Sequence, residues 1–233
     1  MNIRYFGLLT CVYMGVLSAN LSDHEQYLVS HLQNCINLGN QERSKLTPAI
    51  LAMDGMSSAK NRHFLNNLCS MPGTNYLEVG VWKGSTFVSA LFGNASNVLG
   101  AVAIDNWSEF SGPKADFLNN CKFIGDITHA FYEEDCFKIN KEKISKAPIN
   151  IYFYDGEHTA EAQEQAFTYF NDVLDSVFIA VVDDWNHQPV EIGTRAAFNK
   201  LGYTVLFEQV MPARFNGDKE LWWNGLYVAV LRK

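Results

Sequence analysis

Carboxylate side chains follow directly after two apolar segments of the chain. Asp155 follows the run 149–154, and Asp183 and Asp184 follow the run 178–182. Asp155 and Asp183 are 28 residues apart, the length of one strand-helix-strand unit, so parallel strands would deliver these side chains to one sheet edge. Carboxylates held together repel one another unless a cation lies between them. Oxygen ligands suit Mg²⁺, with Mn²⁺ or Ca²⁺ as alternatives. The alternative is that one or two of these residues cap helices or form loop hydrogen bonds.

A glycine-bearing turn is the second segment that could bind a ligand. Residues 76–86, YLEVGVWKGST, read as a strand, a turn and the start of a helix. Glycines let a ligand approach the backbone, and a helix N-terminus offers free N–H groups. A phosphate-binding P-loop is excluded because Lys83 precedes Gly84, and Trp82 replaces the second glycine of the dinucleotide-binding pattern. What remains is a nucleoside-binding loop that contains Gly80, with Glu78 at the end of its strand.

Further candidates follow the next two apolar runs. Asp105 stands after the run 98–104, where a carboxylate can accept both hydroxyl protons of a ribose; a helix-capping or loop role is the alternative. Trp107 could line an adenine pocket or belong to the core. Asp135 could end the third strand and face the base, or be a surface charge. His158 shares the loop of Asp155, which sets it apart from the other histidines.

The elements that must position these residues alternate between strands and helices, which is typical of an α/β domain with a parallel sheet. We expect strands at 75–79, 98–104, 149–154, 178–182, 204–210 and 226–231, with a weaker one at 128–132. The runs 151–154 and 178–182 are apolar or aromatic throughout, as in central strands covered on both faces. The last two strands lack a helix between them, which favours antiparallel pairing.

Helical spacing is clear in two other regions. Tyr27, Leu28, His31, Leu32 and Cys35 indicate a helix that breaks at Gly39, and a second helix should end near Cys69. Between the two central strands, one helical face contains Ala162, Ala166, Phe167, Phe170, Val173 and Leu174.

Composition restricts the class of protein. The 233 residues favour one large domain, and 48% apolar against 18% charged residues exclude a disordered chain. A net charge of −7 disfavours nucleic-acid backbones and anionic membranes as partners. The five cysteines form no C-x-x-C pair, so we expect buried small apolar residues; His63, His129 and His187 should be surface or structural.

The start of the chain admits two interpretations. Residues 1–19 combine a basic beginning with a short apolar run, which fits a signal peptide or an N-terminal helix. No later run is long enough for a stable membrane span.

These motifs together resemble those of the class I S-adenosylmethionine-dependent methyltransferases. The similarity is greatest to the metal-dependent macrocin O-methyltransferase-type sugar enzymes and more distant to catechol O-methyltransferase, and it covers residues 74–233. It implies a Rossmann-like seven-stranded, mostly parallel sheet of order 3-2-1-4-5-7-6 whose last strand is antiparallel, with helices on both faces. Residues 20–73 would form a helical N-terminal extension. The chain departs from the family pattern at Trp82, where a small residue is usual.

The resemblance also implies roles for individual residues. His158 would be the general base, with Asp155 also catalytic, and Asp155, Asp183 and Asp184 would hold the divalent cation, most simply Mg²⁺. The implied S-adenosylmethionine site consists of Glu78, Gly80, Val81, Gly84, Ser85, Asp105, Asn106, Trp107 and Asp135.

The implied activity is metal-assisted methylation of a hydroxyl on a small molecule, with a sugar as one acceptor class. A non-catalytic nucleoside-binding or assembly module of the same fold is the alternative, and a nicotinamide-dependent dehydrogenase is a third. Trp222 and Trp223 would flank the acceptor or pack at the core edge. The chain could also form a homo-oligomer. The supply of S-adenosylmethionine favours a cytoplasmic location, whereas a signal peptide would indicate export.

Overall fold

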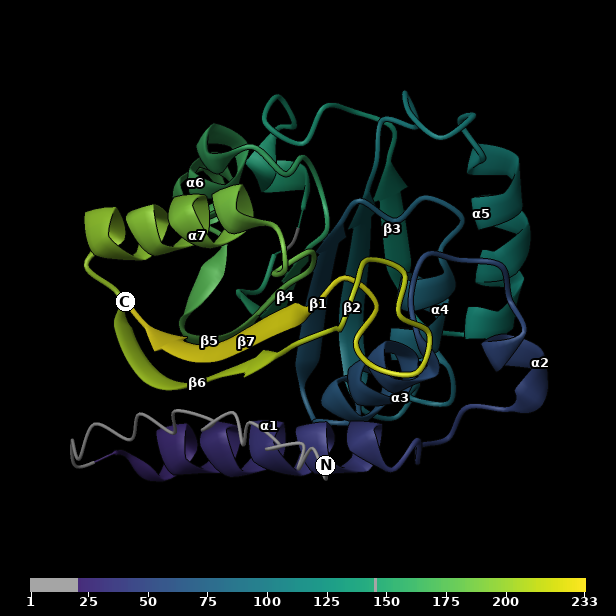
Figure 1. Cartoon of the computed structure of the whole chain (residues 1–233), viewed down its shortest axis with the longest axis horizontal. Coiled ribbons are helices and arrows are strands. Elements are labelled where there is room, and N and C mark those ends of the chain that lie inside the picture. Colours follow the sequence, from purple (N-terminus) through teal and green to yellow (C-terminus); the bar gives the residue numbers. More distant parts are fainter. Residues whose placement is uncertain (1–20, 145) are drawn as a thin grey trace, which may run out of the picture.

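The central feature of the computed structural model, which describes residues 21–144 and 146–233, is a seven-stranded sheet (Figure 1). Its strand order is β3-β2-β1-β4-β5-β7-β6, and β7 runs antiparallel to both β5 and β6. The other pairs are parallel. This confirms the predicted fold class and order. The strands are β1 Thr74–Val79, β2 Val98–Ile104, β3 His129–Tyr132, β4 Ile149–Tyr154, β5 Leu174–Val182, β6 Thr204–Met211 and β7 Leu226–Arg232.

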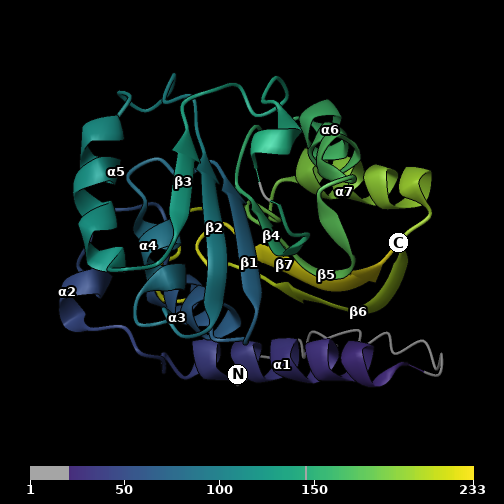
Figure 2. The same ribbon diagram turned by 180° about the vertical axis from the view of Figure 1, so that it is seen from behind.

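Helices cover both faces of the sheet (Figures 1 and 2). One face packs against α1 (Asp23–Asn40), α3 (Ala59–Leu68), α4 (Ser85–Leu91) and α5 (Lys114–Asn120). The opposite face packs against α6 (Ala160–Phe170) and α7 (Gln188–Leu201). Three short elements complete the described part: α2 (Pro48–Leu51) and the 3₁₀ turns η1 (Cys121–Ile124) and η2 (Lys141–Lys143). Strands β4 and β5 are therefore buried on both sides, as their continuous apolar sequences predict.

The first long helix shows how the N-terminal region joins the sheet. Ser22 and Glu25 form a capping box at the start of α1, and Glu25 also forms an ion pair with Arg232 of β7. The helix contacts β5, β6 and β7, and it buries Leu28 and Leu32 in the same core as the sheet. Tyr27, expected on the apolar face, is 47% exposed.

Two expectations for this framework need correction. The helix predicted to include Val173 and Leu174 ends at Phe170, and Leu174 instead opens β5, because it pairs with Ile149 of β4. Cys35 and Cys69 are buried as expected, but Cys121 and Cys136 are only partly buried, and all four are free thiols. Cys11 and the interpretations of residues 1–19 lie outside the described residues. No described helix has the length and apolarity that crossing a membrane requires.

Candidate functional site

A cavity of about 710 Å³ opens at the carboxyl ends of β1, β2, β4 and β5. Open α/β sheets bind ligands at this edge, because the loops that follow neighbouring parallel strands meet there. Most of the predicted site residues line the cavity: Gly80, Asp105, Asn106, Asp135, Asp155, His158, Asp183 and Asp184. The other five, Glu78, Val81, Gly84, Ser85 and Trp107, are not among the lining residues.

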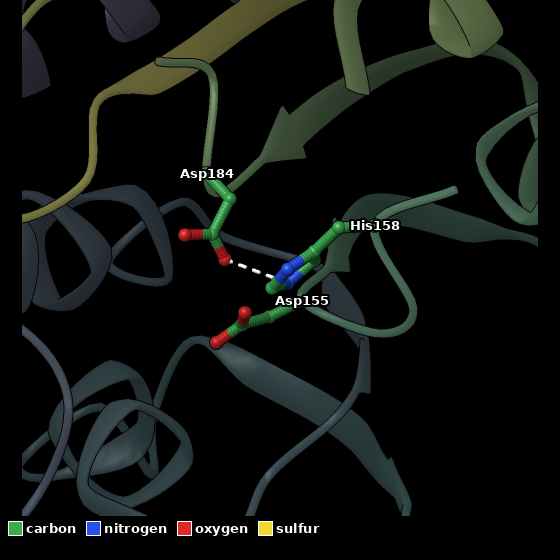
Figure 3. A group of neighbouring side chains, drawn as sticks. All are labelled: Asp155, His158 and Asp184. Carbon is green, nitrogen blue, oxygen red and sulfur yellow. Dashed lines mark ion pairs between the residues drawn. The ribbon is translucent and has the colours of Figure 1, made fainter. Parts of the chain in front are cut away.

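Two carboxylates and an imidazole converge in this cavity (Figure 3). One ligand atom from each of Asp155, His158 and Asp184 lies within 4.8 Å of the others. His158 Nε2 is 2.8 Å from Asp184 Oδ2, and Asn224 Nδ2 donates to Asp184 Oδ1 at 2.5 Å. The parallel pairing of Tyr154 with Val182 places the loops of Asp155 and Asp184 side by side.

The group of converging ligand atoms differs by one residue from the set that was predicted to hold a cation. Asp183 lines the cavity but is not one of the three residues whose ligand atoms converge. Its side chain is 4% exposed, and its Oδ1 has no hydrogen-bond partner in the described part of the chain. The neighbouring Asp184 has a φ of 57°, a left-handed conformation that Asp tolerates better than most residues. This backbone geometry directs the second carboxylate, rather than the first, towards His158.

The electrostatics of the cluster follow from burial and charge. Burial, and then the charges of Asp183 and Asp184, raise the pKa of Asp155 well above its ordinary value. Burial and the charge of Asp184 do the same to the pKa of Asp183. The hydrogen bond to Asp184 raises the pKa of His158, and the charges of Glu109 and Glu157 add to this effect. In the protein alone, burial and mutual repulsion therefore favour the protonated, neutral forms of Asp155 and Asp183.

The glycine turn approaches the cation cluster through its backbone. Gly80 has a φ of 84°, and a Cβ atom there would lie 1.8 Å from the carbonyl oxygen of Asp155. Only glycine fits this close approach. Two positions later, Trp82 also has a positive φ, 43°. Glycine adopts this backbone conformation more readily than a bulky side chain such as that of tryptophan.

Asp105 both lines the cavity and holds this turn in place. Its Oδ2 accepts hydrogen bonds from the backbone N–H groups of Val81 (3.0 Å) and Trp82 (2.8 Å), and its Oδ1 accepts one from Trp107 (2.6 Å). The structure therefore shows the loop-stabilising role directly. Because each carboxylate oxygen has two acceptor sites, the side chain retains capacity for ribose hydroxyls.

Glu78 lies beneath the turn and away from the cavity surface. The side chain is fully buried, and its two oxygens accept hydrogen bonds from the Tyr76 and Thr86 hydroxyls, both at 2.5 Å. Burial raises its pKa to about 7, although both hydrogen bonds oppose the rise. Glu78 therefore links β1 to α4, and it positions the turn rather than lining the cavity.

Four other predicted cofactor residues lie outside the lining of the cavity. Trp107 is 7% exposed and packs against Phe117 and Phe131, so its core interpretation is the one observed. Val81 and Ser85 are buried, and Gly84 caps α4 with a φ of 80°.

Asp135 lies in the loop after β3, three residues beyond its last residue, Tyr132. It lines the cavity and forms an ion pair with Lys138.

The histidines outside the cluster have structural contacts. His63 is buried and lies 2.7 Å from the Ser44 hydroxyl through Nδ1. His129 belongs to β3, and His187 begins α7 with its ring edge-on to that of His158.

Sequence reasoning missed several cavity residues. They are Met56, Glu109, Phe110, Tyr154, Glu157 and Asn224. Tyr154 is 1% exposed, and its hydroxyl has no hydrogen-bond partner among the described residues. The two tryptophans before β7 take different places: Trp222 packs against Phe64 of α3, whereas Trp223 lines the cavity. No local pattern marks these residues, apart from their positions in loops after strands.

Comparison with known proteins supports the fold and no more. No family model matches the sequence, and no curated protein matches it. Solved structures do match. An O-methyltransferase from Bacillus cereus in complex with S-adenosylhomocysteine (SAH) is 13% identical, with a TM-score of 0.55 over 91% of this chain and 98% of that one. The SAH-bound methyltransferase PaMTH1 of Podospora anserina is 11% identical, with a TM-score of 0.56 over 94% and 99%.

The chain has the class I methyltransferase fold. This fold does not determine the acceptor. A Pyrococcus horikoshii protein assigned as an RNA methyltransferase is also similar, at 10% identity and a TM-score of 0.52 over 88% of this chain and 98% of that one.

Proposed function

We propose that this protein is an S-adenosylmethionine-dependent O-methyltransferase that uses a divalent cation to bind the hydroxyl of a small molecule. One observation carries the proposal: a single cavity joins the Asp155, His158 and Asp184 cluster to the glycine turn and Asp105. The similarity in fold to proteins that contain SAH supports it. A sugar as the acceptor, the exclusion of nucleic acid, and the oligomeric state remain predictions.

The cavity fits S-adenosylmethionine in size and in polar groups. A volume of about 710 Å³ lies within the range of roughly 300–1,000 Å³ that is usual for cofactor sites. Gly80 would let the methionine part approach the backbone, and Asp105 would hold the ribose. Asp135 and the unpartnered Tyr154 hydroxyl would face the nucleoside. Bound there, the cofactor would supply an electrophilic methyl group on a sulfonium.

The cluster also fits a divalent cation. Asp155 and Asp184 would be carboxylate ligands, and the orphaned Oδ1 of Asp183 is a polar atom that the cation or its water could satisfy. Mg²⁺ or Mn²⁺ suits such a donor set. A cation held there would act as a Lewis acid towards the acceptor hydroxyl.

The chain's own residues would orient the acceptor and move its proton. Neutral His158 would receive the hydroxyl proton at Nδ1, because Nε2 lies 2.8 Å from Asp184 Oδ2 and donates to it; Asp184 would then stabilise the imidazolium that forms. General bases of this kind contribute about 10²- to 10⁴-fold to the rate. Asn224 holds the other oxygen of Asp184 and thereby keeps the carboxylate turned towards His158. His158 and Asp184 follow β4 and β5, and Asn224 precedes β7, so strands of the central sheet position these groups.

Ligand-dependent stability and methyl transfer test the proposal. S-adenosylmethionine at 100 times its dissociation constant should stabilise the protein by about 2.7 kcal/mol, and MgCl₂ should add to the shift. Purified protein should then transfer labelled methyl groups to a library of small hydroxyl compounds. Stabilisation by NAD instead of S-adenosylmethionine would contradict the proposal and favour a dehydrogenase. Binding without transfer to any compound would favour the non-catalytic module.

A further inference from the structure

The cavity carries an extreme charge composition. Eight of its described lining residues are carboxylates and none is Lys or Arg. Two of the lining residues, Tyr154 and Asp183, have a buried polar atom without a partner among the described residues, as in a site that a ligand completes. A divalent cation held by Asp155 and Asp184 would neutralise the carboxylates of the cluster and leave the other acidic side chains of the cavity uncompensated.

Six of the eight carboxylates form no ion pair in the described part of the chain, and three of these six are glutamates in the loops after β2, β3 and β4. Glu109, Glu134 and Glu157 form no ion pair within residues 21–144 and 146–233. In contrast, Asp135 is paired with Lys138 and Asp184 with His158. Unpaired acidic groups that line a concave site create a negative potential that attracts cations and repels anions.

Glu109 and Glu157 approach the reaction centre from two sides. Glu109 belongs to the loop after β2 and Glu157 to the loop after β4, and β1 lies between these strands. Aromatic rings of Phe110 and Trp223 line the same cavity, and such rings attract organic cations through their faces.

We infer that the methyl acceptor is a hydroxyl compound with a positively charged amine, and that Glu109 and Glu157 bind this amine beside the aromatic wall. The inference rests on the proposed function and specifies its substrate class. Acceptors that carry phosphate, a carboxylate or a nucleic-acid backbone are disfavoured by the same charges. An amine on a sugar or on an aromatic ring would both fit this description.

The test compares ligands that differ only in charge. Dopamine, 4-methylcatechol and 3,4-dihydroxybenzoate share a dihydroxyphenyl ring and are cationic, neutral and anionic. Each is titrated by calorimetry, at low ionic strength, into full-length protein with MgCl₂ and SAH, which prevents turnover. We expect dopamine to bind most tightly and the benzoate most weakly. Glu109→Gln and Glu157→Gln should each weaken dopamine binding by about twofold to fivefold.

The control variant is titrated with the same three ligands. Glu142→Gln removes an exposed, unpaired charge outside the cavity and should leave the order and the affinities unchanged. Equal binding of the three ligands, tighter binding of the benzoate, no binding of dopamine, or an unchanged order in the double Gln variant would overturn the inference. Titration with S-adenosylmethionine alone tests the proposed function separately, because charge selection can be measured in MgCl₂ without any cofactor.

Discussion

Tyr154 and Tyr152 provide a matched pair of hydroxyl groups. Both side chains belong to β4 and are buried, at 1% and 0% exposure. The Tyr152 hydroxyl donates to the Ala166 carbonyl at 3.1 Å, whereas Tyr154 lines the cavity and its buried hydroxyl has no partner among the described residues. Replacing each by Phe removes one oxygen atom and nothing else, so the two variants separate a structural hydroxyl from a ligand-binding one.

The expected free energies have opposite signs. An unsatisfied buried hydroxyl costs about 1–3 kcal/mol, so Tyr154→Phe should leave the unfolding free energy of the free protein unchanged or raise it by up to that amount. Tyr152→Phe loses a formed hydrogen bond and should cost about 1 kcal/mol. In cofactor binding, the two variants should differ in the opposite sense. Tyr154→Phe loses a ligand contact of about 0.5–1.5 kcal/mol, which weakens binding roughly twofold to tenfold, while Tyr152→Phe binds normally.

Urea unfolding without ligand and calorimetric titration with S-adenosylmethionine measure these two quantities. The reasoning would be refuted if Tyr154→Phe were as destabilised as Tyr152→Phe while both bound the cofactor with wild-type affinity. In that case the Tyr154 hydroxyl would be satisfied within the protein and would not face the ligand.

Three further predictions concern the loop and the carboxylates. Burial raises the pKa of Glu78 to about 7, so the folded state binds the carboxyl proton more tightly than the unfolded state does. The free energy of unfolding should therefore fall by about 3 kcal/mol as the pH rises from 4.5 to 7. Urea titrations of Glu78→Gln should lack this dependence on pH. Gly80→Ala should abolish cofactor binding, because its Cβ would meet the Asp155 carbonyl. Gly73 has a similar φ of 80° but open space around it, so the control variant Gly73→Ala should lower the free energy of unfolding by only about 1 kcal/mol and should bind the cofactor normally. Asp183→Asn should stabilise the metal-free protein and lose the MgCl₂-dependent shift in melting temperature; an undiminished shift would contradict its role.

The sheet was predictable because its strands satisfy simple physical conditions. The runs at β4 and β5 are apolar at every position, so only burial on both faces suits them. The lack of a helix between β6 and β7 predicted their antiparallel pairing. The complete strand order came from the family resemblance. The start of β5 at Leu174 was missed because pairing with Ile149, rather than local periodicity, determines it.

The site was predictable as a location but not as a set of side-chain directions. Spacing alone placed Asp155 next to the Asp183–Asp184 pair, yet the φ of Asp184 decides which carboxylate meets His158. Glu78 was expected to line the cavity because it nearly ends β1. Alternation along the strand instead turns it, with Tyr76, towards α4.

Several departures from local stability rules meet at this cavity. Asp183 buries an unpartnered oxygen, Trp82 and Asp184 adopt positive φ angles, and the Tyr154 hydroxyl is unpaired. Each feature costs the free protein stability, by about 1–3 kcal/mol where a buried polar group lacks a partner. Two such features lie outside the cavity: the Ser89 hydroxyl is buried without a partner among the described residues, and Glu42 has a positive φ. Proteins generally accept violations of local rules where they bind a ligand, and here a cation and a nucleoside would satisfy the atoms that folding leaves unsatisfied in the cavity.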